Sequence, residues 1–132
     1  MNIFATDSNP IIAARNLCDK HINKMIVESI KNNVHNHGEH LVEIVVQDGG
    51  SDDFLADEII SALSSTDKFI REKDSGIFDG INKGIGNSTG DLIATLGSDD
   101  RVIDLDLCEL FHLYTNGYNF FQFNIHYTDA NW

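Results

Sequence analysis

Hydrophobic positions along the chain follow two spacings, one typical of helices and one typical of strands. Residues 10–33 favour a helix in which Pro10 falls within the first turn, where its missing N–H costs little. The positions that share one helical face are Ile22, Met25, Ile26, Val27 and Ile30. This spacing predicts a single helix over residues 10–33.

Shorter apolar runs alternate with further helical segments. We expect strands at residues 2–6, 42–47, 68–72, 91–96 and 119–125, and helices at residues 54–64, 77–87 and 104–115. Strands that alternate with helices form a mostly parallel sheet that is flanked by helices. The sequence therefore predicts an α/β fold, and because it contains neither repeats nor a linker, it predicts one domain over residues 1–132.

Acidic residues follow three of the expected strands. Asp48 follows the strand at 42–47, Asp74 follows the next strand, and Asp99 and Asp100 follow the strand at 91–96. Ligands of open α/β sheets bind beyond the carboxyl ends of the strands, so parallel neighbouring strands would bring these carboxylates together. A Mg²⁺ or Mn²⁺ ion would offset their repulsion, which predicts a metal-bound nucleoside diphosphate compound as the ligand. The alternative is that the paired aspartates only form a turn or cap a helix.

The composition restricts the possible partners and compartment. Nine Lys and Arg residues against 21 Asp and Glu residues give a net charge of −12, which argues against binding of nucleic acid. No apolar run reaches the roughly 18 residues of a membrane helix, and no signal peptide opens the chain. We therefore expect a cytoplasmic protein without a transmembrane segment, in which Cys18 and Cys108 are free thiols.

The most specific pattern lies in the segments EIVVQDGGSDD and REKDSGIFDGINKGIGNSTGDLIATLGSDD. They resemble family 2 glycosyltransferases, whose motifs read E-I-I-V-V-D-G-G-S-x-D, then E-x-D-x-G-I-Y-D-A-M-N-K-G-I, then L-N-x-D-D. Two positions depart from this pattern, because Gln47 stands where the family often has valine or aspartate and Gly97 replaces the usual asparagine. The resemblance covers about residues 42–105 and implies a GT-A fold, the nucleotide-diphospho-sugar transferase type, in an incomplete form.

The resemblance also implies a function and a set of site residues. It implies metal-assisted transfer of a sugar from a UDP- or GDP-linked donor to a saccharide or another hydroxyl acceptor, as in polysaccharide biosynthesis. The residues that it assigns to the nucleotide sugar are Asp48 for the base, Glu72 and Asp74 for the nucleotide pocket, Asn82 and Lys83 for its rim, and Asp99 for the ribose. It assigns the Mn²⁺ or Mg²⁺ cofactor to Asp100, within the DxD-like motif Ser98-Asp99-Asp100.

The two ends of the chain match the family less closely. Family enzymes carry their catalytic base well beyond the DxD motif, whereas this sequence stops at Trp132, so we expect the acceptor half to be missing and assign no catalytic residue. Residues 1–29 weakly resemble the start of small uncharacterised proteins of tailed phages. An alternative is therefore a truncated, catalytically inactive nucleotide-binding remnant of phage origin. A flavodoxin-like or receiver domain also places acids at strand ends, but it lacks the DGINKGI segment.

Overall fold

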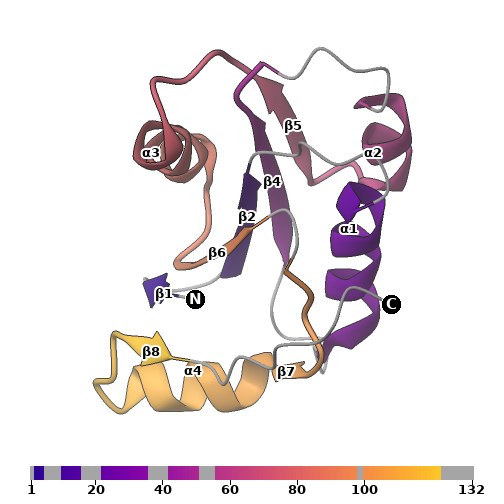
Figure 1. The fold of residues 1–132 in the computed structure, drawn as a ribbon. Coiled ribbons are helices and arrows are strands. Elements are labelled where there is room, and N and C mark those ends of the chain that lie inside the picture. The colour runs from indigo at the N-terminus through magenta and orange to yellow at the C-terminus, as the bar shows by residue number, and fades with distance from the viewer. Residues whose placement is uncertain are drawn as a thin grey trace.

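Strands and helices alternate along the chain, as Figure 1 shows. The structure is a computed structural model and describes residues 2–4, 10–15, 22–35, 42–50, 56–97 and 100–122. In chain order the elements are β1 (Asn2–Phe4), β2 (Pro10–Arg15), α1 (Ile22–Asn33), β3 (Val34–His35), β4 (Glu43–Asp48), α2 (Ala56–Ala62), β5 (Lys68–Arg71), α3 (Ile77–Asn87), β6 (Leu92–Gly97), β7 (Leu105–Asp106), α4 (Leu107–Thr115) and β8 (Phe121–Gln122). The expected α/β fold is confirmed.

The main sheet combines parallel strands with an antiparallel edge. Within the described residues its strand order is β5-β4-β2-β6-β1-β8. Strands β5, β4, β2 and β6 run parallel, whereas β1 pairs antiparallel with both β6 and β8. A separate two-stranded sheet pairs β3 with β7. The parallel part therefore has all its carboxyl ends at one edge, where ligands of such sheets bind.

The predicted helix over residues 10–33 is wrong in its first part. Pro10–Arg15 is a strand, and within the described residues of this segment the helix comprises Ile22–Asn33. The apolar residues that indicated a helix all lie between positions 22 and 30, so the periodic signal never included the segment that forms the strand. Parallel pairing with both β4 and β6 makes this segment a central strand. Pro10 stands at its first residue, a position that proline tolerates in a sheet.

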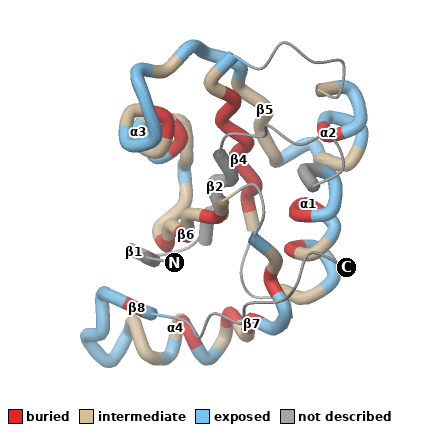
Figure 2. Tube along the Cα trace, viewed as in Figure 1, coloured by how far each residue is buried: buried red, intermediate tan, exposed pale blue. Residues whose placement is uncertain are grey.

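Helices cover both faces of the sheet, with α1 and α2 on one face and α3 on the other (Figure 1). The main core lies beneath α1 and α2, where the buried residues of α1, β4 and β6 meet (Figure 2). Its members in these elements are Ile26, Val27, Ile30, Ile44, Val46, Leu92, Ala94 and Leu96. Helix α3 instead buries Gly80 and Gly84, so its backbone packs close to the sheet, while Ile77 and Phe78 are exposed.

Each helix in the described ranges falls short of the length and apolar character that a membrane span requires.

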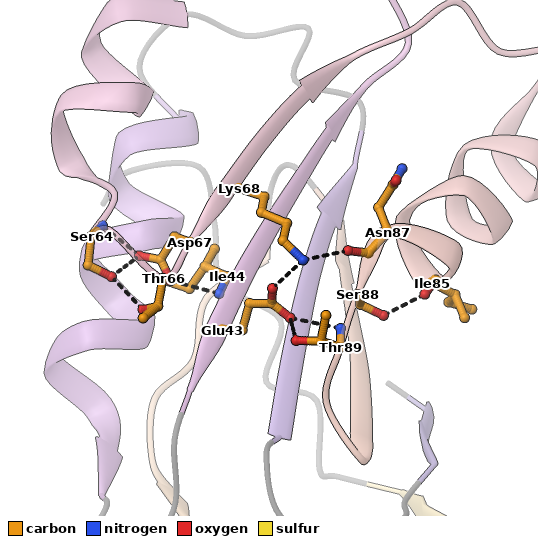
Figure 3. Close-up of polar contacts among 10 residues, drawn as sticks. All are labelled: Glu43, Ile44, Ser64, Thr66, Asp67, Lys68, Ile85, Asn87, Ser88 and Thr89. Atoms are coloured by element: carbon orange, nitrogen blue, oxygen red, sulfur yellow. Dashed lines mark hydrogen bonds and ion pairs between the residues drawn. The ribbon is translucent and has the colours of Figure 1, made fainter.

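A polar cluster joins α3 to the amino ends of β4 and β5 (Figure 3). Glu43 is buried and forms an ion pair with Lys68, with 2.6 Å between Oε1 and Nζ. Its other oxygen accepts hydrogen bonds from the backbone N–H and the hydroxyl of Thr89, at 2.9 and 3.0 Å. Lys68 also donates to the carbonyl of Asn87 at 2.8 Å. This cluster fixes the end of α3 at the sheet edge opposite the carboxyl ends.

Asp67 forms a second link between the turn before β5 and the first residues of β4 (Figure 3). Its Oδ1 accepts a hydrogen bond from the backbone N–H of Ile44 at 2.9 Å. Its Oδ2 accepts from the backbone N–H and the hydroxyl of Ser64, at 2.7 and 2.6 Å. The carboxylate therefore satisfies backbone donors that the strands themselves do not pair.

Glu43→Gln should destabilise the fold and change its response to acid. Burial raises the pKa of Glu43, but the hydrogen bonds from Lys68 and Thr89 outweigh burial and hold the pKa below its ordinary value of 4.5. The ionised carboxylate therefore stabilises the native state fully above pH 4.5, and this contribution is lost as the pH falls through the lowered pKa. We expect the variant to lose about 1–3 kcal/mol of unfolding free energy at pH 7.

Urea unfolding at pH 7 and at steps down to pH 3 measures this difference, which should shrink with acidification. Glu28→Gln is the matched control, because Glu28 pairs with Lys24 on an exposed helix surface and each side chain there is about half exposed. An equal loss of stability in both variants at pH 7 would contradict the role of Glu43.

Candidate functional site

The parallel strands deliver charged side chains to one edge of the sheet. Strand β4 ends at Asp48, β5 ends at Arg71, and β6 ends at Gly97, three positions before Asp100. Strands β4 and β5 are neighbours, but β2 lies between β4 and β6. Two strand spacings, roughly 10 Å, therefore separate β4 from β6. The expected acids share an edge, with Asp48 and Asp74 toward one end and Asp100 further along it.

Asp48 is held tightly at the end of β4, with a relative exposure of 1%. Its Oδ1 accepts a hydrogen bond from the backbone N–H of Gly50 at 3.2 Å. Its Oδ2 forms an ion pair with the Nε of Arg71, from the neighbouring strand. The backbone carbonyl of Asp48 also accepts from the N–H of Glu72 at 2.9 Å. The two strand ends are thus joined through both backbone and side chains.

Asp74 packs against the turn that follows Asp48. A Cβ atom at Gly49 would lie 3.0 Å from the Cγ of Asp74 and closer still to its Oδ2, so only glycine fits without displacing that carboxylate. The Oδ1 of Asp74 accepts a hydrogen bond from the N–H of Gly76 at 3.0 Å. The structure therefore places Asp74 beside the turn that follows Asp48.

Lys83 connects the loop after β5 to α3. Its Nζ lies 2.9 Å from the Oε1 of Glu72 and 3.5 Å from the Oδ2 of Asp79, and it donates to the carbonyl of Lys73 at 2.7 Å. The hydrogen bond to Glu72 raises the pKa of Lys83 above its ordinary value. Hydrogen bonds from Ser75 lower the pKa of Asp79, at 2.9 Å from the backbone N–H and 3.1 Å from the hydroxyl. Lys83 therefore remains protonated and fixes the loop that carries Asp74.

Asn82 lies on the exposed surface of α3, next to Lys83 in the sequence. Within the described part of the chain, no contact ties Asn82 to the candidate site. Its place at the rim of a nucleotide pocket stays a prediction.

Asp100 lies in the turn after β6 and is exposed. Its Oδ2 accepts a hydrogen bond from the N–H of Gly97 at 2.6 Å, and its own N–H donates to the carbonyl of Gly97 at 3.2 Å. These two bonds close the turn and fix the direction of the carboxylate. Asp99 lies outside the described residues, so its predicted contact with a ribose stays a prediction.

The donor set at this edge suits a hard divalent cation that is shared with a ligand. Among the described residues no three His, Cys, Asp or Glu side chains form a group that could hold a metal ion without other ligands. Mg²⁺, however, is usually bound by one or two carboxylates together with substrate phosphates. The exposed carboxylate of Asp100 fits that mode of binding, with its orientation set by Gly97.

Arg71 lies at the candidate site, paired with Asp48, although no motif in the sequence pointed to it. In the sequence it is one cation at the end of a short strand, and only the strand register places it opposite Asp48. The available signal for this ion pair was an arginine at the last position of one strand and an aspartate at the last position of its neighbour. Using that signal requires knowing that the two strands are adjacent.

Two comparisons with known proteins bear on the chain. A family model, described as glycosyl transferase family 2, matches residues 11–132. A search of curated proteins gave no match. The family match begins within β2 and so extends further in both directions than the motifs quoted above.

Gly49→Ala should destabilise the site, because the added methyl group meets the carboxylate of Asp74. We expect a loss of about 1–3 kcal/mol in the free energy of unfolding, measured by urea denaturation. Gly86→Ala is the matched control, since a Cβ there meets nothing within 4 Å and the residue lies inside a helix. The control should gain about 0.5–1 kcal/mol. Equal stability of Gly49→Ala and the wild type would contradict the close packing of Gly49 and Asp74.

Proposed function

The chain belongs to glycosyltransferase family 2, and on that premise we propose that it transfers a sugar from a UDP- or GDP-linked donor to a hydroxyl acceptor, such as a saccharide. Glycosyl transfer is the reaction class of the family. The observation that carries the finer proposal is the shared sheet edge, where Asp48, Asp74 and Asp100 follow parallel strands.

The nucleoside end of the donor is assigned to the loops after β4 and β5. Carboxylates accept hydrogen bonds from the N–H of a base and from ribose hydroxyls. Asp48 supplies such an acceptor at the end of β4, Asp74 supplies another beside the turn that follows it, and Glu72 lies in the same loop as Asp74. Lys83 supports this end by holding that loop against α3, and Asn82 is assigned to the rim.

The diphosphate end is assigned to the turn after β6. Asp100 would hold a Mn²⁺ or Mg²⁺ ion there, together with phosphate oxygens of the donor, and Asp99 would contact the ribose. The ion supplies charge stabilisation for the departing nucleoside diphosphate. The separation of roughly 10 Å between β4 and β6 is comparable to the span of a nucleotide from its base across the ribose to its phosphates. Within the described residues we assign no base that deprotonates the acceptor.

Isothermal titration calorimetry with UDP and with GDP, in the presence and absence of Mn²⁺, tests this proposal. We expect the wild-type chain to bind one of the two nucleotides, and to bind it more tightly with Mn²⁺. Asp100→Asn keeps the shape of the side chain but removes its charge, so it should lose roughly tenfold or more of the Mn²⁺-dependent affinity.

Asp104→Asn is the matched control, because Asp104 is an exposed carboxylate in the same connection and pairs only weakly with His35 at 3.2 Å. If Asp100→Asn binds nucleotide and Mn²⁺ as tightly as the wild type, the assignment of the metal to Asp100 fails.

A separate measurement distinguishes an active enzyme from an inactive nucleotide-binding remnant. We expect slow release of UDP or GDP from a matching nucleotide sugar, and chelation of the metal by EDTA should abolish it. Tight Mn²⁺-dependent nucleotide binding without any such release, over a panel of nucleotide sugars, would favour the remnant.

A further inference from the structure

Arg71 is placed against Asp48 by the pairing of the two strands. Strands β4 and β5 run parallel, and their register sets Asp48 directly opposite Arg71. Residues that are opposite each other in a sheet turn their side chains to the same face. The Nε of Arg71 forms an ion pair with the Oδ2 of Asp48. The contact is therefore built into the sheet and does not depend on a loop.

The two partners differ strongly in exposure. The Asp48 side chain is 2% exposed, whereas that of Arg71 is 39% exposed. A buried carboxylate is costly unless it is paired and hydrogen-bonded, so Asp48 depends on Arg71 more than Arg71 depends on Asp48. Arg71 is thus the solvent-exposed member of the pair, at the edge where the donor is proposed to bind.

A second contact fixes the guanidinium group. Phe69 stands two residues before Arg71 on the same face of β5, and the Arg71 Cζ lies 5.6 Å from the centroid of its ring. Phe69 itself packs against the hydrophobic core. The aromatic ring therefore restricts the arginine side chain from one side while the carboxylate restricts it from the other.

The positive charge of Arg71 also matters because a second carboxylate, that of Asp74, lies nearby. Asp74 packs against Gly49, the residue next to Asp48, so a second carboxylate lies at this end of the site. Neighbouring carboxylates oppose each other's ionisation. The positive charge of Arg71 offsets this repulsion from within the chain, at the end of the site that lies away from Asp100.

We propose that Arg71 is a positioning residue of the donor site, which orients the Asp48 carboxylate and keeps it ionised so that it can accept a hydrogen bond from the nucleotide base. This inference rests on the function proposed above. Arginine is required rather than lysine, because its planar group can stack on Phe69 while Nε donates to the carboxylate. The role is exerted through Asp48, so Arg71 itself needs no contact with the ligand.

A double-mutant cycle tests this inference, with the wild type, R71Q, D48N and R71Q/D48N titrated with the nucleotide, UDP or GDP, that the wild type binds in the presence of Mn²⁺. We expect R71Q alone and D48N alone each to weaken binding roughly tenfold. Because Arg71 acts through Asp48, the double variant should bind no more weakly than D48N. R71K should recover part of the loss, since it restores the charge but not the stacking geometry.

K24Q removes a positive charge from an exposed pair on α1 and should bind like the wild type. Thermal unfolding of every variant establishes that it is folded at the assay temperature, and R71K replaces R71Q in the cycle if R71Q is not.

Three outcomes would overturn the inference, and they are distinguishable. Wild-type affinity in R71Q shows that the ion pair has no role in binding. A further loss in the double variant, equal to that of R71Q alone, shows that Arg71 contacts the ligand directly or acts independently of Asp48. Absence of nucleotide binding by the wild type removes the proposed function, and the positioning role with it.

Discussion

The parallel insertion of β2 between β4 and β6 is the constraint on which the rest of the structure depends. It aligns the carboxyl ends of β4, β5 and β6 at one edge, and each of these ends is followed by acidic residues. Carboxylates gathered in this way repel each other unless cations are present. At the β4 and β5 end the chain supplies those cations itself, through Arg71 and Lys83. At the β6 end Asp100 is exposed, which is where a cation from solution is proposed to act.

Helix α3 is attached to both edges of the sheet by polar contacts. From the middle of the helix, Lys83 binds Glu72 and the carbonyl of Lys73, on the side of the candidate site. At the opposite edge, the last helical residue Asn87 contacts Lys68, and Thr89, just after the helix, contacts Glu43. Buried glycines let the helix backbone approach the sheet. The loop that carries Asp74 and the amino ends of β4 and β5 are therefore attached to the same helix.

Much of this arrangement could be predicted from the sequence, and the failures have a physical cause. The helix at 77–87 was predicted with its observed bounds, because its spacing is a local property. The rule that parallel strands share a carboxyl edge predicted that the ends of β4, β5 and β6 would lie on one side of the sheet, and the strand pairing confirms this. The strand Pro10–Arg15 was mistaken for helix, since only pairing on both sides identifies a central strand. Arg71 was missed for the same reason, because its partner depends on the strand register rather than on the spacing along the chain.

The two faces of β4 make different kinds of contact, apolar on one face and polar on the other. Ile44 and Val46 point into the core beneath α1 and α2, whereas Glu43 and Gln47 meet α3 and its end. Gln47 is 1% exposed, and within the described part of the chain its Nε2 finds no hydrogen-bond partner while its Oε1 accepts a long bond of 3.4 Å from Asn87. A buried unpaired donor costs about 1–3 kcal/mol, which an apolar residue such as valine would not incur. The α3 face is therefore held by directional polar contacts and close glycine packing, and less by apolar burial. Lys83 contributes both to this attachment and to the position of the loop that carries Asp74, so the attachment of α3 and the geometry of the candidate site depend on the same residue.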